Sequence, residues 1–168
     1  MESTRINNGQ ILITGGSGVL GSYIVNSLKD EYDVVIADVE KPSYANGVKF
    51  VRADLRKPFF ISKEFKVCIH LAAHVGGIQY FTKHPVENIR DNPRMTANML
   101  DAAVDSNLDQ IIYTSSSVVY QNQREFPTPE DSVMGSPPPT SAYGMSKLFG
   151  EFMCKTYNEQ FGLKYTIL

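Results

Sequence analysis

The stretch Gln10-Ile-Leu-Ile-Thr14-Gly15-Gly-Ser-Gly18-Val-Leu-Gly21 decides the fold of this chain. Its first five residues form a short apolar run that indicates a buried strand, and the helical pattern Tyr23 to Lys29 follows the glycines. Glycine lets the backbone turn tightly and lie close to a pyrophosphate, and the N–H groups at the start of a helix favour its negative charge. The order of strand, glycine turn and helix therefore predicts a dinucleotide-binding turn.

The glycine spacing can be described in two ways, as Gly15-x-x-Gly18-x-x-Gly21 or as Gly16-x-Gly18-x-x-Gly21. Both describe a dinucleotide turn. A plain tight turn is the alternative for the glycines taken alone, and the strand and helix on either side favour the cofactor-binding interpretation.

Two acidic residues follow at the ends of the next two expected strands. Asp38 ends the run Asp33–Asp38 and lies 17 residues beyond Gly21, where a Rossmann unit places the acid that binds the adenosine ribose hydroxyls. Such an acid favours NAD over NADP, because a 2′-phosphate would meet like charge; the alternative is a strand-end turn residue. Asp54 could accept a hydrogen bond from the adenine amino group or cap a helix.

Tyr143 and Lys147 are spaced so that one helix places both side chains on the same face. A neighbouring ammonium favours the ionised form of a phenol, so we expect the pKa of Tyr143 to fall and its side chain to take a proton from an alcohol near neutral pH. The alternative is an exposed pair on an amphipathic helix, and the dinucleotide turn earlier in the chain disfavours it.

Short apolar runs alternate with helical or mixed segments, which predicts an α/β fold with a doubly wound parallel sheet of the Rossmann type. Because such strands are covered on both faces, they read as continuous apolar runs. The expected strands are Gln10 to Thr14, Val34 to Asp38, Lys49 to Arg52, Val67 to Leu71 and Gln110 to Thr114.

A helix from about Glu87 to Asp105 carries Met95, Met99, Ala102 and Ala103 at helical spacing, which indicates a core stripe. A loop of about twenty residues starts at Gln121 and ends in a proline-rich stretch before Tyr143. A loop of this length is more typical of a functional or mobile segment than of a simple connection between two elements.

Composition is typical of one globular domain, residues 1–168, with 42% hydrophobic residues. A net charge of -2 and a sequence pI of about 5.9 provide no electrostatic footprint for nucleic acid. The N-terminus lacks a basic leader with an apolar segment, and no apolar run approaches the ~20 residues of a membrane span. We therefore expect a cytoplasmic protein.

The sulfur and imidazole groups give no sign of a metal site. Cys68 lies in an apolar run and Cys154 on a helix, so we expect buried or partly buried free thiols. His70, His74 and His84 share no metal-ligand spacing, and we predict no metal.

With these motifs, the chain resembles the short-chain dehydrogenase/reductase superfamily, and in particular its extended branch of nucleotide-sugar epimerases, dehydratases and reductases. The resemblance spans nearly the whole chain. It rests on segments in the family's order: Thr14–Gly21, Asp38, Asp54-Leu55, His70–Ala73, Asn92–Ala103, Thr114–Tyr120 and Tyr143-x-x-x-Lys147.

By position, the resemblance implies that Tyr143 is the acid/base and that Lys147 binds the ribose and modulates the phenol pKa. Ser116 is the implied substrate-orienting hydroxyl, with Ser117 a close competitor because the serine run is ambiguous. The implied NAD-binding residues are Gly15, Gly18, Val19, Leu20, Gly21, Asp38, Asp54, Leu55, Leu71, Ala72, Ala73, Asn92, Tyr143 and Lys147.

Departures from the family pattern rank the implied reactions. Dehydratases carry an Asp-Glu pair where this chain has Ser117 and Val118, which disfavours dehydration. Ala73–Ile78 resembles enzymes acting on GDP-mannose-derived sugars, including the one that makes GDP-fucose, but those place a catalytic cysteine at the Val118 position. C4 epimerisation through a 4-keto sugar therefore ranks first and 4-keto reduction second. A non-catalytic NAD-binding module is the alternative from another class.

The segment Leu163 to Leu168 resembles the sixth strand of the family, after which relatives continue for about as much chain again. That part forms the lobe that binds the nucleotide-sugar substrate, and we expect it to be missing here. The isolated chain is then expected to bind NAD with little or no turnover, because the reacting carbon is not positioned. The full-length protein is expected to be a homodimer.

Overall fold

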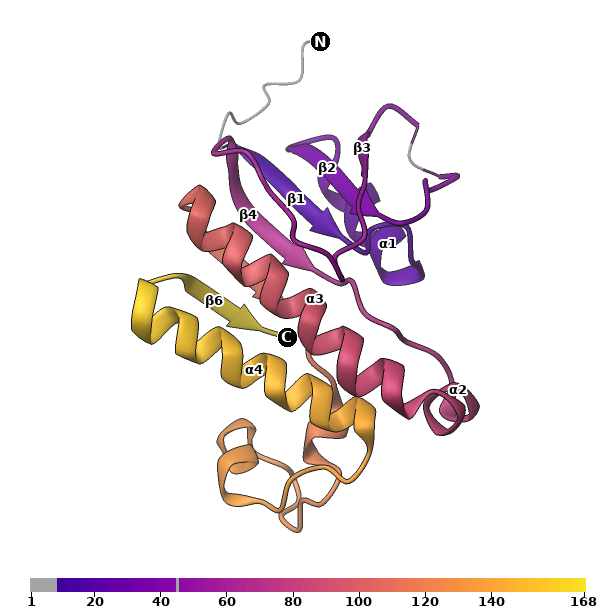
Figure 1. Ribbon diagram of the computed structural model, residues 1–168, viewed down its shortest axis with the longest axis vertical. Helices are drawn as coiled ribbons and strands as arrows, with labels where there is room; N and C mark the ends of the chain where they lie inside the picture. Colours follow the sequence, from indigo (N-terminus) through magenta and orange to yellow (C-terminus); the bar gives the residue numbers. More distant parts are fainter. Residues whose placement is uncertain (1–8, 45) are drawn as a thin grey trace.

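The computed structural model describes residues 9–44 and 46–168. All strand pairs are parallel, and the sheet has the order β3-β2-β1-β4-β5-β6 (Figure 1). The strands are β1 (Gln10–Thr14), β2 (Asp33–Asp38), β3 (Lys49–Arg52), β4 (Phe65–His70), β5 (Gln110–Tyr113) and β6 (Lys164–Ile167). The helices are α1 (Val19–Leu28), α2 (Ile78–Lys83), α3 (Pro85–Ser106) and α4 (Ala142–Phe161), with 3₁₀ helices η1 (Ser117–Tyr120) and η2 (Glu130–Gly135). The predicted doubly wound parallel sheet is confirmed.

The strand order reverses between β1 and β4. From β1 the chain builds outward through β2 to β3, then returns to the other side of β1 and builds outward again from β4 to β6. In an open parallel sheet, ligands bind outside the carboxyl ends of the strands at such a reversal. The fold therefore places a crevice directly after Thr14 and His70, which are paired across β1 and β4.

Helices cover both faces of the sheet. Because successive strand residues point to opposite sides, neighbouring residues of β1 pack against different helices. Leu12 packs in the cluster that includes Met99 of α3 and Cys154 of α4, whereas Ile13 packs with Val25 of α1. Both β1 side chains are fully buried. This explains why the strands read as continuous apolar runs.

The long helices α3 and α4 lie side by side across one face of the sheet (Figure 1). The predicted core stripe of α3, Met95, Met99, Ala102 and Ala103, is buried along its whole length. Gly150 allows α4 to approach β5 closely, since a Cβ there would lie 2.1 Å from the Tyr113 hydroxyl.

Most boundaries match the expectations, and the differences have local causes. Helix α1 begins at Val19, not Tyr23, because Gly18 already has the extended conformation of an N-cap. Strand β4 starts at Phe65, which pairs with Gln10 across a register shift, and ends at His70 before Leu71. The loop from Gln121, at the bottom of Figure 1, lies beyond the carboxyl ends of the strands and contains the unpredicted η2.

Candidate active site

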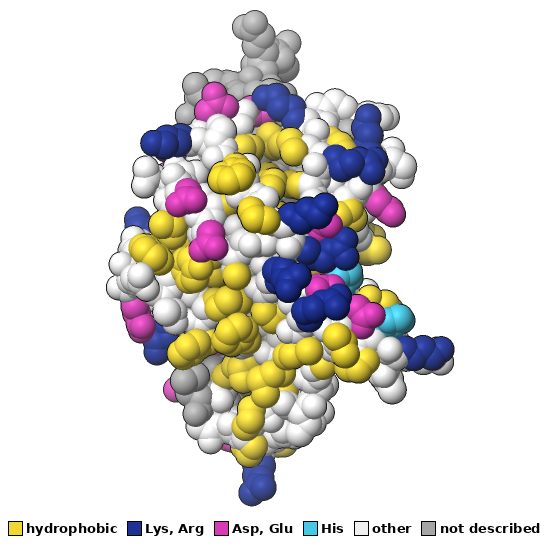
Figure 2. Space-filling view, viewed as in Figure 1, with side chains coloured by type: hydrophobic (Ala, Val, Ile, Leu, Met, Phe, Trp, Pro, Cys, Tyr) yellow, Lys and Arg dark blue, Asp and Glu magenta, His cyan; other side chains and the backbone are white. Residues whose placement is uncertain are grey.

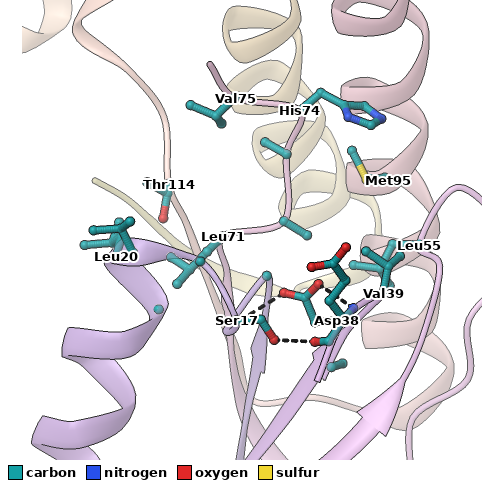
Figure 3. A pocket seen from close by; sticks show the side chains of 18 of the residues that line it. Ser17, Leu20, Asp38, Val39, Leu55, Leu71, His74, Val75, Met95 and Thr114 are labelled. Atoms are coloured by element: carbon teal, nitrogen blue, oxygen red, sulfur yellow. Dashed lines mark hydrogen bonds between the residues drawn. The ribbon is translucent and has the colours of Figure 1, made fainter. Parts of the chain in front are cut away.

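A pocket of about 960 Å³ opens at the carboxyl edge of the sheet, where the strand order reverses (Figure 3). Its lining comes from the glycine turn and the start of α1, the end of β2, the segments after β3, β4 and β5, and the helices α3 and α4. It includes 13 predicted site residues: Gly15, Gly18, Val19, Leu20, Gly21, Asp38, Asp54, Leu55, Leu71, Ala72, Ala73, Tyr143 and Lys147. The glycine turn and the Tyr-Lys pair thus line one pocket.

The glycines of the turn have different tasks. Gly15 has a φ of +70°, and a Cβ there would lie 2.5 Å from the backbone nitrogen of Ala72, so the turn lies directly against the segment after β4. A Cβ on Gly21 would lie 2.4 Å from the carbonyl oxygen of Gly16. Gly15, Gly18 and Gly21 line the pocket, whereas Gly16 packs under Ile36 of β2.

The start of α1 opens into the pocket. The helix begins at Val19, so the first N–H groups of Val19, Leu20 and Gly21 have no carbonyl partner within the helix. These residues line the pocket, which therefore has a helix N-terminus, with its partial positive charge, in one wall.

Asp38 ties the glycine turn to the end of β2. One carboxylate oxygen accepts the N–H of Ser17 at 3.0 Å, and the other accepts the N–H of Glu40 at 3.3 Å. Figure 3 shows Ser17 and Asp38 facing each other at the foot of the pocket. The carboxylate is thus a turn residue and a pocket-lining acid at once.

Asp54 lies in the turn after β3, and no helix follows it, so the helix-cap alternative is wrong. Its carboxylate binds the Arg56 guanidinium through two bonds of 2.8 Å and accepts the Arg56 backbone N–H at 3.1 Å. This hydrogen bonding lowers the pKa of Asp54 to about 2. The turn therefore presents an ionised carboxylate to the pocket.

Tyr143 and Lys147 lie on the first turns of α4, which Ser141 caps by accepting the N–H of Gly144 at 3.1 Å. Both side chains are buried, with exposed fractions of 8% and 5%. The alternative of a solvent-exposed pair is wrong. The Ser116 hydroxyl lies close enough to the phenol of Tyr143 to lower its pKa.

The expected fall in the pKa of Tyr143 is wrong for this structure. Burial raises the pKa of the phenol, and the nearby Ser116 hydroxyl offsets only part of the rise. The ring of Phe81 stacks on Tyr143 with centroids 4.3 Å apart, which excludes water from one face. The Lys147 ammonium donates instead to the Thr114 carbonyl at 2.6 Å and lies 5.1 Å from the centre of the Tyr113 ring. Burial lowers the pKa of Lys147 to about 8.

The three successive serines have different environments. Ser116 caps η1 by accepting the N–H of Val118 at 3.3 Å and reaches Tyr143. Ser117 is exposed, and Ser115 donates to the carboxylate of Glu151. Ser116 therefore meets the phenol, although it does not itself line the pocket.

Asn92 does not line the pocket, contrary to its assignment to the cofactor-binding set. It is buried on α3, where its side chain accepts the N–H of His74 at 2.7 Å and donates to the His74 carbonyl at 3.3 Å. Its place in the fold is to hold the segment after β4, which does line the pocket.

The pocket also contains residues that sequence reasoning missed. Thr114 and Ser115 directly follow β5, and Arg56 and Glu40 lie two residues after the predicted acids Asp54 and Asp38, so proximity to a motif was the available signal. Met95 was expected only in the core, yet it is buried and lines the pocket as well (Figure 3).

The structure describes residues 9–44 and 46–168, and these ranges were compared with the requirements of a metal site and of a membrane-spanning helix. Within these ranges, no three His, Cys, Asp or Glu side chains are grouped to hold a metal ion. Within the same ranges, none of the helices has both the length and the apolar character needed to cross a membrane.

Comparison with known proteins gives consistent relatives. A putative UDP-glucose 4-epimerase from Methanocaldococcus jannaschii is 34% identical, with 94% of this chain and 54% of the relative covered. A GDP-L-fucose synthase from Sinorhizobium fredii is 26% identical over 98% of this chain and 52% of the relative. The crystal structure of a UDP-galactose 4-epimerase superposes with a TM-score of 0.83 and 30% identity, over 94% of this chain and 54% of that one.

A Thermus thermophilus UDP-glucose 4-epimerase, solved in complex with NAD, has a TM-score of 0.80 and 26% identity, over 94% of this chain and 53% of that one. The chain spans about half the length of the curated relatives it matches. Residues 11–168 match the NAD dependent epimerase/dehydratase family. The chain with this glycine turn and buried Tyr-Lys pair belongs to the NAD-dependent epimerase/dehydratase family.

Proposed function

We propose that the protein interconverts the C4 epimers of a nucleotide-sugar with NAD, and that this chain supplies the cofactor site and the acid/base group. The observation that carries the proposal is that the buried Tyr143 and Lys147 line the same pocket as the glycine turn. The similarity to UDP-glucose 4-epimerases supports this choice of reaction.

The residues present fit NAD, the cofactor of the family. The helix N-terminus at Val19 would hold the pyrophosphate, and Gly15, which has no Cβ, lets the glycine turn lie directly against Ala72. Asp38 would bind the adenosine ribose hydroxyls, and Asp54 would accept from the adenine amino group. Ala72 and Ala73 would line the groove by backbone contact.

Ser116 and Tyr143 would act directly on the sugar hydroxyl. Ser116 would hold the hydroxyl oxygen while Tyr143 removes its proton, and Tyr143 would return that proton when the 4-keto sugar is reduced. NAD, when bound, takes up and gives back the hydride and brings a positively charged ring that favours the phenolate. The raised pKa of Tyr143 favours the protonated phenol, the form that acts as the acid in the return step, so the first proton removal depends on the positive charges of the bound nicotinamide and of Lys147.

Lys147 would bind the cofactor ribose and stabilise the phenolate through its charge. Its ammonium already lies inside the pocket and donates to Thr114. Because its pKa is about 8, the charge is largely retained at neutral pH and lost above it. This predicts that activity supported by Lys147 falls as the pH rises through that value.

The test is the interconversion of UDP-galactose and UDP-glucose by the full-length protein and by this chain. In the full-length protein, Tyr143→Phe should lower kcat by about 100-fold or more, with the Kd for NAD changed by less than about threefold. Tyr120→Phe is the matched control, since its hydroxyl contacts the Glu130 carbonyl outside the pocket. Unchanged turnover in Tyr143→Phe would refute the assigned role.

The isolated chain is expected to bind NAD with little or no turnover. It spans about half the length of its relatives, and the missing substrate contacts leave the sugar unpositioned. Turnover by this chain alone, lost in Tyr143→Phe, would contradict that expectation while supporting the reaction.

Reduction of a 4-keto sugar is the second candidate, supported by the similarity to a GDP-L-fucose synthase and by the segment Ala73–Ile78. Val118 ranks it lower, because an aliphatic side chain cannot exchange a proton at the position of the relatives' cysteine. A non-catalytic NAD-binding module is disfavoured by the buried Tyr143 and Lys147 in the pocket wall, because a pure binder does not need an acid/base phenol there.

We also propose that the full-length protein is a cytoplasmic homodimer. Support for the dimer comes from exposed apolar residues, Val86 and Ile89 on α3 and Phe149 and Phe152 on α4, on helices that share one face of the sheet. Figure 2 shows hydrophobic side chains gathered over this face. The cytoplasmic assignment agrees with two free cysteines, both buried.

A further inference from the structure

The turn after β3 is a rigid part of the pocket wall. The Asp54 carbonyl accepts the N–H of Lys57 at 3.0 Å, which closes the turn. The Asn98 side chain on α3 donates to the Leu55 carbonyl at 2.7 Å, and the Leu55 side chain is buried. The turn is therefore fixed both by its own hydrogen bonds and by the neighbouring helix.

Arg56 fixes the carboxylate that this turn presents. Oδ1 of Asp54 accepts two bonds, from the backbone N–H and from Nε of Arg56, and Oδ2 accepts one, from the guanidinium NH2. Each carboxylate oxygen can accept about two hydrogen bonds. Among the described residues, Oδ2 thus has one acceptor position left, and both side chains line the pocket.

The walls near this carboxylate suit a flat aromatic ring. The pocket lining includes the apolar residues Ala37, Val39, Ala53, Leu55 and Met95, of which Ala53 and Leu55 directly flank Asp54. Basic and acidic side chains gather in this region of the surface, over α3 and the chain after β3 (Figure 2). Apolar walls beside a charged acceptor are suited to a purine whose exocyclic group is a donor.

We infer that Arg56 sets the base preference of the cofactor site, by locking the Asp54 carboxylate so that Oδ2 accepts from the 6-amino group of adenine. A purine with a 6-oxo group would bring an acceptor against an acceptor-only carboxylate, and neither group would be satisfied. The low pKa of Asp54 keeps the carboxylate ionised throughout the neutral range. The inference rests on the proposed function in one respect, that NAD occupies this pocket.

Two simpler functions for Arg56 make different predictions. If the guanidinium only stacked on the base, its removal would weaken binding of all purines alike, because each has a π face. If it acted only through its charge, lysine would replace it. If Arg56 instead orients the carboxylate through two parallel hydrogen bonds, the planar guanidinium is required. Replacement by lysine should then abolish the base preference as replacement by alanine does.

The experiment compares the Kd of NAD with that of nicotinamide hypoxanthine dinucleotide, whose 6-oxo group replaces the 6-amino group, by calorimetric titration of this chain. The wild type should prefer NAD by about tenfold or more. In Arg56→Ala and Arg56→Lys the ratio should fall to within about threefold of one. Lys57→Ala is the matched control, because Lys57 is the adjacent exposed cation that acts on Asp54 by charge alone, and it should keep the wild-type ratio.

Each other outcome overturns the inference. Equal binding of the two dinucleotides by the wild type would mean that Asp54 does not distinguish the bases. Equal weakening of both in Arg56→Ala would indicate stacking, and a full ratio in Arg56→Lys would indicate charge alone. If the folded wild type binds neither dinucleotide, the cofactor site of the proposed function fails as well, which separates that failure from failure of the base preference alone.

Discussion

Burial acts in opposite directions on the two central residues, because it disfavours whichever form is charged. It raises the pKa of Tyr143 and lowers that of Lys147 to about 8. Each group is therefore held closer to its neutral form than an exposed side chain would be. The Ser116 hydroxyl opposes the effect at Tyr143, whereas burial alone accounts for the lowered pKa of Lys147.

Lys147 should make stability depend on pH. Between about pH 8 and the ~10.4 of an exposed lysine, the unfolded chain binds more protons than the folded one, so the free energy of unfolding should rise with pH. Below that window the full cost of the buried charge is present. Lys147→Met should therefore gain about 1–3 kcal/mol relative to the wild type near pH 7, and this gain should shrink towards pH 10.

Urea unfolding of both proteins across this range provides the measurement. In the variant the Thr114 carbonyl loses its donor at every pH, which adds a constant cost. The test is therefore how the difference in the free energy of unfolding between the two proteins changes with pH, and not its absolute size. A difference that stays constant from about pH 7 to about pH 10 would contradict the assigned cause.

The sequence predicted the pairing of Tyr143 with Lys147 because a spacing of four residues determines a shared helical face. It could not predict the direction of the phenol pKa. That direction depends on burial by distant residues such as Phe81 and on the Lys147 ammonium turning to Thr114. The orientation of Ser116 likewise followed from η1, which no sequence pattern indicated.

At the scale of elements, helix α3 holds two of the loops that border the pocket. Asn92 binds the backbone of His74 after β4, and Asn98 binds the Leu55 carbonyl after β3. The sequence indicated the core stripe of this helix, because apolar spacing is local information. It assigned Asn92 to the cofactor, because the contact with His74 joins residues 18 apart that only the folded sheet brings together.

The glycine turn gives the sharpest prediction at this scale. In Gly15→Ala, the new side chain would have to adopt a positive φ and its Cβ would lie 2.5 Å from the backbone of Ala72. We therefore expect the free energy of unfolding to fall by about 1–3 kcal/mol and the variant to bind NAD at least about tenfold more weakly. Thermal unfolding and calorimetric titration measure the two effects.

Gly47→Ala is the control for strain alone. Gly47 also has a positive φ, of +82°, but no described heavy atom lies within 4 Å of the position that its Cβ would take. The free energy of unfolding of Gly47→Ala should fall by about 1 kcal/mol, and the variant should keep its affinity for NAD. Equal losses of affinity in the two variants would mean that the close approach of Gly15 to Ala72 has no importance for the site.

At the scale of the whole molecule, the pocket that we propose for NAD is lined by residues of this chain at the carboxyl edge of the six-stranded sheet, although the chain spans about half the length of its relatives. NAD that binds only the folded chain should then stabilise it. At a free concentration of 100 times the Kd, the free energy of unfolding should rise by about 2.7 kcal/mol, which for a chain of this size raises the Tm by about 5–10 °C. Thermal unfolding with and without NAD measures the shift, and an unchanged Tm would contradict an independent cofactor site.

The most direct test of the central claim, that the glycine turn and Tyr143 belong to one NAD site, is a crystal structure of this chain with NAD. The proposed site predicts the adenine beside Asp54, the pyrophosphate against the first turn of α1, and the nicotinamide ring next to the Tyr143 hydroxyl. A structure in which NAD binds in the pocket with its nicotinamide ring directed away from Tyr143 would contradict the claim.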